Sequence, residues 1–112
     1  FKEWFILPKQ ENNIKTGWLA FPLLVSENAP FTRREVQIFL EKRNIQTRVI
    51  FTGNILRQPG FKNIKCRVDK KGYKNADYIM KNGFMIALHH GLTTKMIKNL
   101  YSSFDLLLKL YK

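Results

Sequence analysis

Cys66, His89 and His90 are the only thiol or imidazole side chains in this sequence, the types that bind soft metal ions or form a Cys–His pair for nucleophilic catalysis. His89 and His90 are adjacent, and adjacent residues of an extended chain point to opposite faces, so we do not expect both to bind one ion. The paired cysteines and spaced histidines of zinc sites do not occur. No carboxylate stands at a recognisable spacing from either histidine, and the glycines form no phosphate-binding loop. We therefore predict no metal site, no catalytic residue and no cofactor-binding residue within the chain.

The sequence is strongly basic: 20 Lys and Arg against 8 Asp and Glu give a net charge of +12. Eight of the cations lie in the span Arg57–Lys81, which contains Pro59, Gly60 and Gly72 and is therefore predicted to be irregular. Aromatic residues between the cations would suit single-stranded nucleic acid, although no recognition-helix or RNA-binding motif is present. The first interpretation is a solvated surface loop, and a basic nucleic-acid-binding module stays as an alternative.

Composition places the chain among single globular domains. Of its 112 residues, 45% are hydrophobic, which is enough for one core of ordinary size. No apolar run approaches the roughly 20 residues that span a bilayer, so we predict no membrane partner. The single cysteine excludes an internal disulfide bond, and no secretory signal pattern is present. The chain begins with Phe1 instead of Met, and we expect it to be a piece of a longer protein.

The clearest local pattern is the capping box Thr32-Arg-Arg-Glu35. In such a box the first side chain accepts from the backbone amide of the last residue, and the last side chain accepts from the first amide. Phe31 before the box and Val36 after it would pack together as a hydrophobic staple. We predict a helix that begins after Thr32 and stops at Asn44.

Three apolar runs are predicted to be strands: Trp18–Val25, Ile45–Phe51 and Phe84–Leu88. The first and third are continuous, which is typical of strands buried on both faces. Pro22 interrupts the first run, and because proline has no N–H to donate, it indicates an edge or a bulge there.

Two further helices are expected. Asn75 is the predicted cap of a short helix that Gly83 closes, and Thr93 is the predicted cap of a long amphipathic last helix. The order of elements predicts an α/β (α+β) fold: a two-layer sandwich with a small three-stranded sheet and helices on one face.

The stretch Thr47-Arg-Val-Ile-Phe-Thr-Gly-Asn54, followed by Arg57-Gln-Pro-Gly-Phe61, resembles the carboxy-terminal small domain of the DegT/DnrJ/EryC1/StrS family, which has the aspartate-aminotransferase fold. It is most similar to the 3-dehydratase branch, which acts on nucleotide-linked 4-keto-6-deoxyhexoses. Four further blocks stand in the family's order: Phe5–Pro8, Trp18–Pro22, Ala29–Glu35 and Gly91–Thr93. One departure is His90, where family members usually have proline.

The resemblance implies that residues 1–17 connect to a missing large domain and that residues 18–112 are the C-terminal small domain of a fold type I enzyme. The large domain would bind pyridoxal or pyridoxamine phosphate (PLP or PMP), so no cofactor is expected in this chain. The longer protein would be a cytoplasmic homodimer that dehydrates a nucleotide-linked sugar for deoxysugar or lipopolysaccharide synthesis, and this chain alone would have no turnover. A sugar-nucleotide aminotransferase of the same family is the alternative.

The resemblance also implies that the small domain closes over the cofactor cleft, with Arg48, Asn54, Arg57 and Gln58 as substrate-binding residues at the edge that faces it. The forked donors of arginine suit anionic groups, and side-chain amides can form hydrogen bonds with the substrate. The alternative is that Asn54 and Gln58 only shape the loop and that both arginines are solvated.

Overall fold

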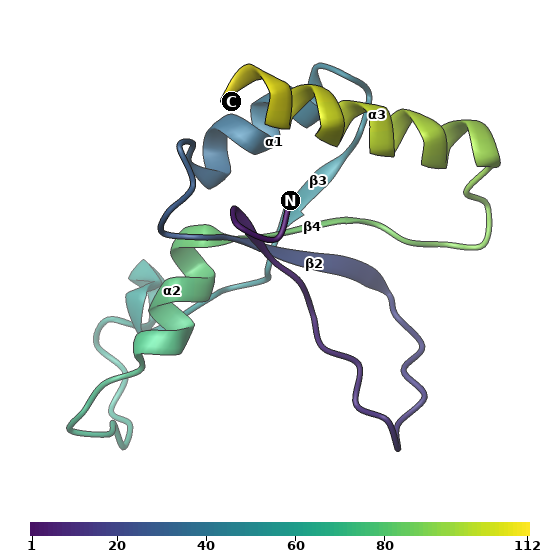
Figure 1. Cartoon of the computed structure of the whole chain (residues 1–112). Coiled ribbons are helices and arrows are strands. Elements are labelled where there is room, and N and C mark those ends of the chain that lie inside the picture. The colour runs from purple at the N-terminus through teal and green to yellow at the C-terminus, as the bar shows by residue number, and fades with distance from the viewer.

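Four antiparallel strands form the sheet, in the order β1-β2-β4-β3 (Figure 1). The computed structural model describes all residues from 1 to 112, and the strands are β1 (Phe5–Ile6), β2 (Ala20–Val25), β3 (Thr47–Val49) and β4 (Gly83–Ala87). The three predicted strands are present with shorter bounds. The fourth, β1, comes from the segment predicted to be a connection, so the sheet is larger than the three strands expected.

The predicted edge position of Pro22 is confirmed. β1 pairs only with Leu24 and Val25, so at Pro22 strand β2 has β4 as its one neighbour, opposite Met85. The other side of β2 is open at this point, where the missing N–H of proline removes no ladder hydrogen bond.

Three α-helices accompany the sheet: α1 (Arg33–Glu41), α2 (Lys74–Asn82) and α3 (Thr94–Leu110). The two helices α1 and α3 cover one face, whereas α2 lies on the other side of the sheet (Figure 1). This arrangement confirms the predicted α/β fold, with its two substantial helices on one face. None of the helices has the length and apolar composition needed to cross a membrane.

The core lies between the sheet and the pair α1 and α3. Successive strand residues point to opposite faces, so alternate residues of β2 and β4 meet the helices. The ten buried hydrophobic residues come from all of these elements and from the segment before α1. They are Phe5, Leu23, Val25, Phe31, Val36, Leu40, Phe84, Ile86, Phe104 and Leu107.

The capping box of α1 is confirmed. Oγ1 of Thr32 accepts from the Glu35 amide (3.3 Å), and Oε2 of Glu35 accepts from the Thr32 amide (2.6 Å). That second hydrogen bond is the main reason why the pKa of Glu35 lies below its ordinary value. The helix ends as expected before Asn44, whose φ of 60° is in the left-handed region that stops a helix.

The predicted cap of α2 is wrong. The amide of Asp77 donates to the carbonyl oxygen of Tyr73 (3.0 Å), so the helix begins at Lys74 with Tyr73 as its N-cap. Asn75 therefore lies inside the first turn, and no side chain caps the helix.

Gly83 closes α2 as predicted and is also the first residue of β4. A Cβ atom there would lie 2.6 Å from the carbonyl oxygen of Ile79 and 2.7 Å from Cδ1 of Ile50. Because such contacts are too short, glycine is what lets the helix pass into the strand without a connecting loop.

Phe5→Ala should lower the free energy of unfolding by about 3–5 kcal/mol, the usual range for a buried phenylalanine. Phe5 is 1% exposed, and its ring centroid lies 4.8 Å from that of Phe1 and 5.5 Å from that of Phe104. Ile6→Ala is the matched control because Ile6 is 47% exposed, and it should cost about 1 kcal/mol or less. Urea unfolding of the two variants checks the contrast; equal losses would contradict the place given to β1 in the core.

Candidate functional site

A tight turn after β3 brings the predicted site residues against α2. Phe51 (φ 37°) and Gly53 (φ 61°) both have left-handed backbone conformations, which glycine adopts without strain. A Cβ atom at Gly53 would also overlap Cβ of Met80 on α2. The backbone of the turn therefore touches the helix, and the next residue, Asn54, is placed beside it.

Asn54 is fixed by both ends of its amide. Its Oδ1 accepts from the Leu56 amide (3.1 Å) and so caps the short 3₁₀ helix η1 (Ile55–Arg57), while its Nδ2 donates to Oδ1 of Asp77 (2.8 Å). The side chain is buried, with 5% of the residue exposed. Asn54 thus ties the loop to the first turn of α2.

Arg57 makes a bidentate ion pair with the same carboxylate. Its Nε donates to Oδ1 of Asp77 and its Nη2 donates to Oδ2, both at 3.0 Å. The Arg57 side chain is 65% exposed and that of Asp77 is 37% exposed. A planar fork on a carboxylate fixes the orientation of the guanidinium as well as its position.

These contacts change the titration of both partners. The hydrogen bonds from Arg57, followed by the one from Asn54, lower the pKa of Asp77 from 3.8 to about 2. The hydrogen bond to Asp77 is the main cause of the raised pKa of Arg57. The carboxylate is therefore ionised, and the pair stays charged, across the whole neutral range.

Gln58 closes the loop on itself. Its Nε2 donates to the carbonyl oxygen of Thr52 (2.8 Å), which bridges the end of η1 to the turn before it. A second 3₁₀ turn, η2 (Pro59–Phe61), follows directly. Three of the four predicted site residues, Asn54, Arg57 and Gln58, therefore belong to one loop whose shape they help to set.

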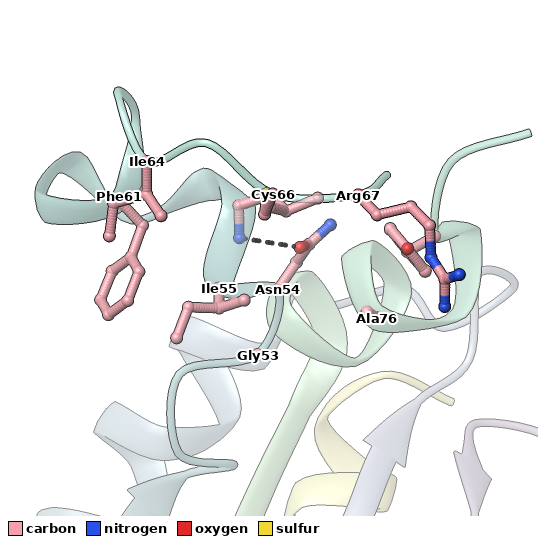
Figure 2. Close-up of a pocket in the computed structure, with 10 residues that line it drawn as sticks. Gly53, Asn54, Ile55, Phe61, Ile64, Cys66, Arg67 and Ala76 are labelled. Atoms are coloured by element: carbon pink, nitrogen blue, oxygen red, sulfur yellow. Dashed lines mark hydrogen bonds between the residues drawn. The ribbon is translucent and has the colours of Figure 1, made fainter. Parts of the chain in front are cut away.

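A mostly apolar hollow of about 400 Å³ lies between this loop and the start of α2 (Figure 2). Asn54 lies in its wall, and the dashed line in Figure 2 marks its hydrogen bond to the Leu56 amide. Arg67 and Tyr73 are among the polar residues that line it, whereas Arg57 and Gln58 do not line it.

Arg48 stands apart from the other three predicted residues. It lies on the edge strand β3 opposite Met85, is exposed, and lines a separate hollow between β3 and α1. In that hollow Glu41 accepts from the Thr47 amide (2.7 Å), and this hydrogen bond is the main reason for its lowered pKa, to which the charge of Arg48 adds. The four predicted residues therefore do not share one surface. Asn54, Arg57 and Gln58 belong to the loop after β3, whereas Arg48 lies at the hollow between β3 and α1.

Asp77 is the site residue that the sequence-based prediction missed. The sequence predicts Asp77 only as part of the short helix, within the basic span Arg57–Lys81. The available signal was its position: a carboxylate in the first turn of a helix, 20 residues from an arginine in a basic segment. A sequence separation of 20 residues does not by itself show that two side chains are in contact.

The side chains of Cys66, His89 and His90 are all exposed. The ring centroids of His89 and His90 are 6.4 Å apart, and Nδ1 of His89 accepts from the amide of Gly91 (3.1 Å). Cys66 lies in the loop before α2, and no cluster of three potential metal ligands forms.

The arrangement of strands and helices is that of a domain found in solved enzymes. A crystal structure of a GDP-4-keto-6-deoxymannose-3-dehydratase mutant with bound GDP-perosamine matches 90% of this chain, with a TM-score of 0.78 and 22% identity. The E. coli GDP-4-keto-6-deoxy-D-mannose-3-dehydratase with bound hydrated PLP matches 98% of this chain, with a TM-score of 0.74 and 20% identity. In each case the match covers 26% of the solved chain. The fold is therefore that of a small domain of fold type I PLP-dependent enzymes.

Sequence comparison identifies the family. The model of the DegT/DnrJ/EryC1/StrS aminotransferase family matches residues 2–105, and the chain belongs to this family. It is 36% identical over 103 residues to the lipopolysaccharide biosynthesis protein RfbH of Salmonella typhimurium, a match that covers 92% of this chain and 23% of RfbH. It is 35% identical over 92 residues to the dTDP-4-dehydro-2,6-dideoxy-D-glucose 3-dehydratase of Saccharopolyspora spinosa, covering 82% and 20% respectively. The chain spans about a quarter or less of the length of these relatives.

The Asp77 carboxylate should make stability depend on pH in the acid range. Its folded-state pKa of about 2 is below its ordinary value of 3.8, so its contribution is fully present above pH 4 and is lost as the pH falls through 2. Asp77→Asn removes this contribution. The gap in unfolding free energy between wild type and variant should be constant from pH 7 to about 4 and shrink below that. Urea unfolding at a series of pH values measures it, and a gap that stays constant down to pH 2 would contradict the ion pair.

Proposed function

We propose that this chain is the C-terminal small domain of a PLP- or PMP-dependent nucleotide-sugar 3-dehydratase, with residues 1–17 as the connection to the rest of the enzyme and residues 18–112 as the domain itself. The observation that carries the proposal is the family match over residues 2–105, together with relatives that are named as 3-dehydratases. The longer protein would be a cytoplasmic homodimer in deoxysugar or lipopolysaccharide synthesis, in keeping with the name of RfbH.

In this proposal the loop after β3 faces the substrate, and its residues have different tasks. Arg57 is the group that contacts an anion, because its side chain is largely exposed and its Nη1 has no partner within the chain. Asn54 and Gln58 keep the loop in shape, since their amide N–H groups are engaged by Asp77 and by Thr52. Arg48 would contact the substrate from the hollow between β3 and α1.

The cofactor belongs to the rest of the enzyme. The hollow beside Asn54 is lined by no lysine and no histidine, and His89 and His90 are exposed and lie outside it. The residues of this hollow therefore do not fit a PLP site, and no catalytic step is assigned to them. The contribution of the domain is to close over the cleft, exclude water and hold the substrate.

The two alternatives are not favoured. A sugar aminotransferase belongs to the same family, but the sequence relatives whose names state a reaction, such as the protein of Saccharopolyspora spinosa, are 3-dehydratases. A nucleic-acid-binding module would explain the charge of +12 without explaining the family match over almost the whole chain.

The product distinguishes the dehydratase from the aminotransferase. The full-length protein, incubated with PMP and CDP-, GDP- or dTDP-linked 4-keto-6-deoxyhexoses, should give a sugar that has lost its 3-hydroxyl group. Mass spectrometry of the nucleotide sugar checks this outcome. A product in which an amino group replaces the 4-keto oxygen would instead identify an aminotransferase.

Arg57→Ala in the full-length enzyme should raise KM for an anionic substrate by about 10- to 100-fold, the usual range when a charged hydrogen-bond donor to a ligand is removed. Lys70→Ala is the matched control, because it removes one exposed cation of the same basic segment and so changes the net charge equally. Lys70→Ala should leave KM within about twofold of wild type. Equal effects of the two variants would show that charge alone, and not the position of Arg57, decides binding.

A further inference from the structure

Asp77 is the one carboxylate that contacts the predicted site residues, and it accepts hydrogen bonds from two of them. We propose that Asp77 is a positioning residue for substrate binding: it holds the guanidinium of Arg57 so that its remaining N–H groups face an oxyanion of the substrate. The inference rests on the function proposed above and adds to it a residue and a binding geometry.

The geometry of the ion pair determines which part of Arg57 is left for a ligand. A guanidinium has five N–H groups, and Asp77 accepts from Nε and from one N–H of Nη2. Both N–H groups of Nη1 and the second N–H of Nη2 remain. One from each nitrogen forms a second fork, at the end of the side chain, that matches two oxygens of a phosphate or a carboxylate.

The position of Asp77 is fixed by hydrogen bonds to its own carboxylate and to helix α2. Its Oδ1 also accepts from Nδ2 of Asn54, which is buried and locked onto the Leu56 amide. At the other end of α2, Nη1 of Arg33 donates to the carbonyl oxygen of Met80 (2.7 Å). The carboxylate therefore has a fixed position before any ligand arrives, and it transfers that position to Arg57.

Fixing Arg57 in advance matters because its side chain is 65% exposed. A free arginine in that setting samples many rotamers, and ordering it on binding reduces affinity. With Asp77 present, most of this ordering has taken place during folding. The negative charge of Asp77 also weakens the general attraction of Arg57 for anions, so a ligand must match the fork to bind well.

The ligand is an oxyanion with two oxygens free to accept from the fork. Two molecules in the proposed reaction could supply it: the diphosphate of the nucleotide sugar, or the carboxylate of an amino-acid cosubstrate such as glutamate. If the diphosphate binds Arg57, the KM for the nucleotide sugar responds to substitution; if the carboxylate binds, the KM for the cosubstrate responds. Steady-state assays of the full-length enzyme therefore vary the concentration of each molecule in turn.

The test is a double-mutant cycle of Asp77→Asn and Arg57→Ala in the full-length enzyme, with Asp69→Asn as the control. The control makes the same Asp-to-Asn change in the loop before α2. The carboxylate of Asp69 accepts from the Lys71 amide and has no contact with Arg57. Asp77→Asn should raise one KM by about 3- to 10-fold with little change in kcat, the effect of ordering one long side chain. Asp77→Glu, which keeps the charge, should give a smaller rise, and Asp69→Asn should give none.

The cycle separates positioning from structural support. If Asp77 acts through Arg57, Asp77→Asn causes no further rise in KM once Arg57 is alanine. Three results would overturn the inference. The effects of the two substitutions on KM could multiply in the double variant, or Asp77→Asn could leave KM unchanged. Asp77→Asn could also lower KM, because the carboxylate competes with the ligand. An effect of Arg57→Ala without one of Asp77→Asn would overturn it while leaving the proposed function intact; no effect of Arg57→Ala would remove the proposed role of Arg57 itself.

Discussion

The carboxylate of Asp77 holds the loop 50–61 against helix α2. Every hydrogen bond between the loop 50–61 and helix α2 ends on this group: one comes from Asn54 and two come from Arg57. The remaining hydrogen bonds of the loop join residues within it, such as Gln58 and Thr52, or join its ends to the residues that flank it in the sequence. The loop could therefore keep its own shape without Asp77, but its place on the domain and the direction of Arg57 depend on that carboxylate.

The position of Asp77 depends in turn on how α2 is attached to the sheet. Gly83 is shared by the end of α2 and the start of β4, and β4 lies between β2 and β3 in the sheet. The hydroxyl of Tyr78 donates to the carbonyl oxygen of Val25 (3.1 Å), and Arg33 binds the last turn of the helix. A continuous series of contacts thus runs from the central strands through α2 to the exposed arginine, which is how a rigid scaffold supports a loop that carries function.

Local patterns in the sequence predicted the elements well, and the contacts between distant residues much less. The capping box at Thr32 and the apolar runs of β2 and β4 were sufficient because caps and burial are encoded by neighbouring residues. The motif around Asn54 and Arg57 marked the loop, but hydrogen-bond partners 20 residues away are set by tertiary packing, so Asp77 was missed. β1 was missed because two residues are too few for a strand pattern, and its pairing with β2 is decided by burial of Phe5.

The same limit applies to the charge of the chain. Of its 20 Lys and Arg residues, only Lys9 and Arg57 lie within salt-bridge distance of a carboxylate. Exposed cations without a fixed partner attract anions of many kinds and are screened by salt, so they contribute little selectivity. Arg57 differs because its orientation is set by a carboxylate that is itself fixed by a buried amide. The feature that marks this cation for a specific ligand is therefore the acid beside it, and a count of positive charges does not reveal it.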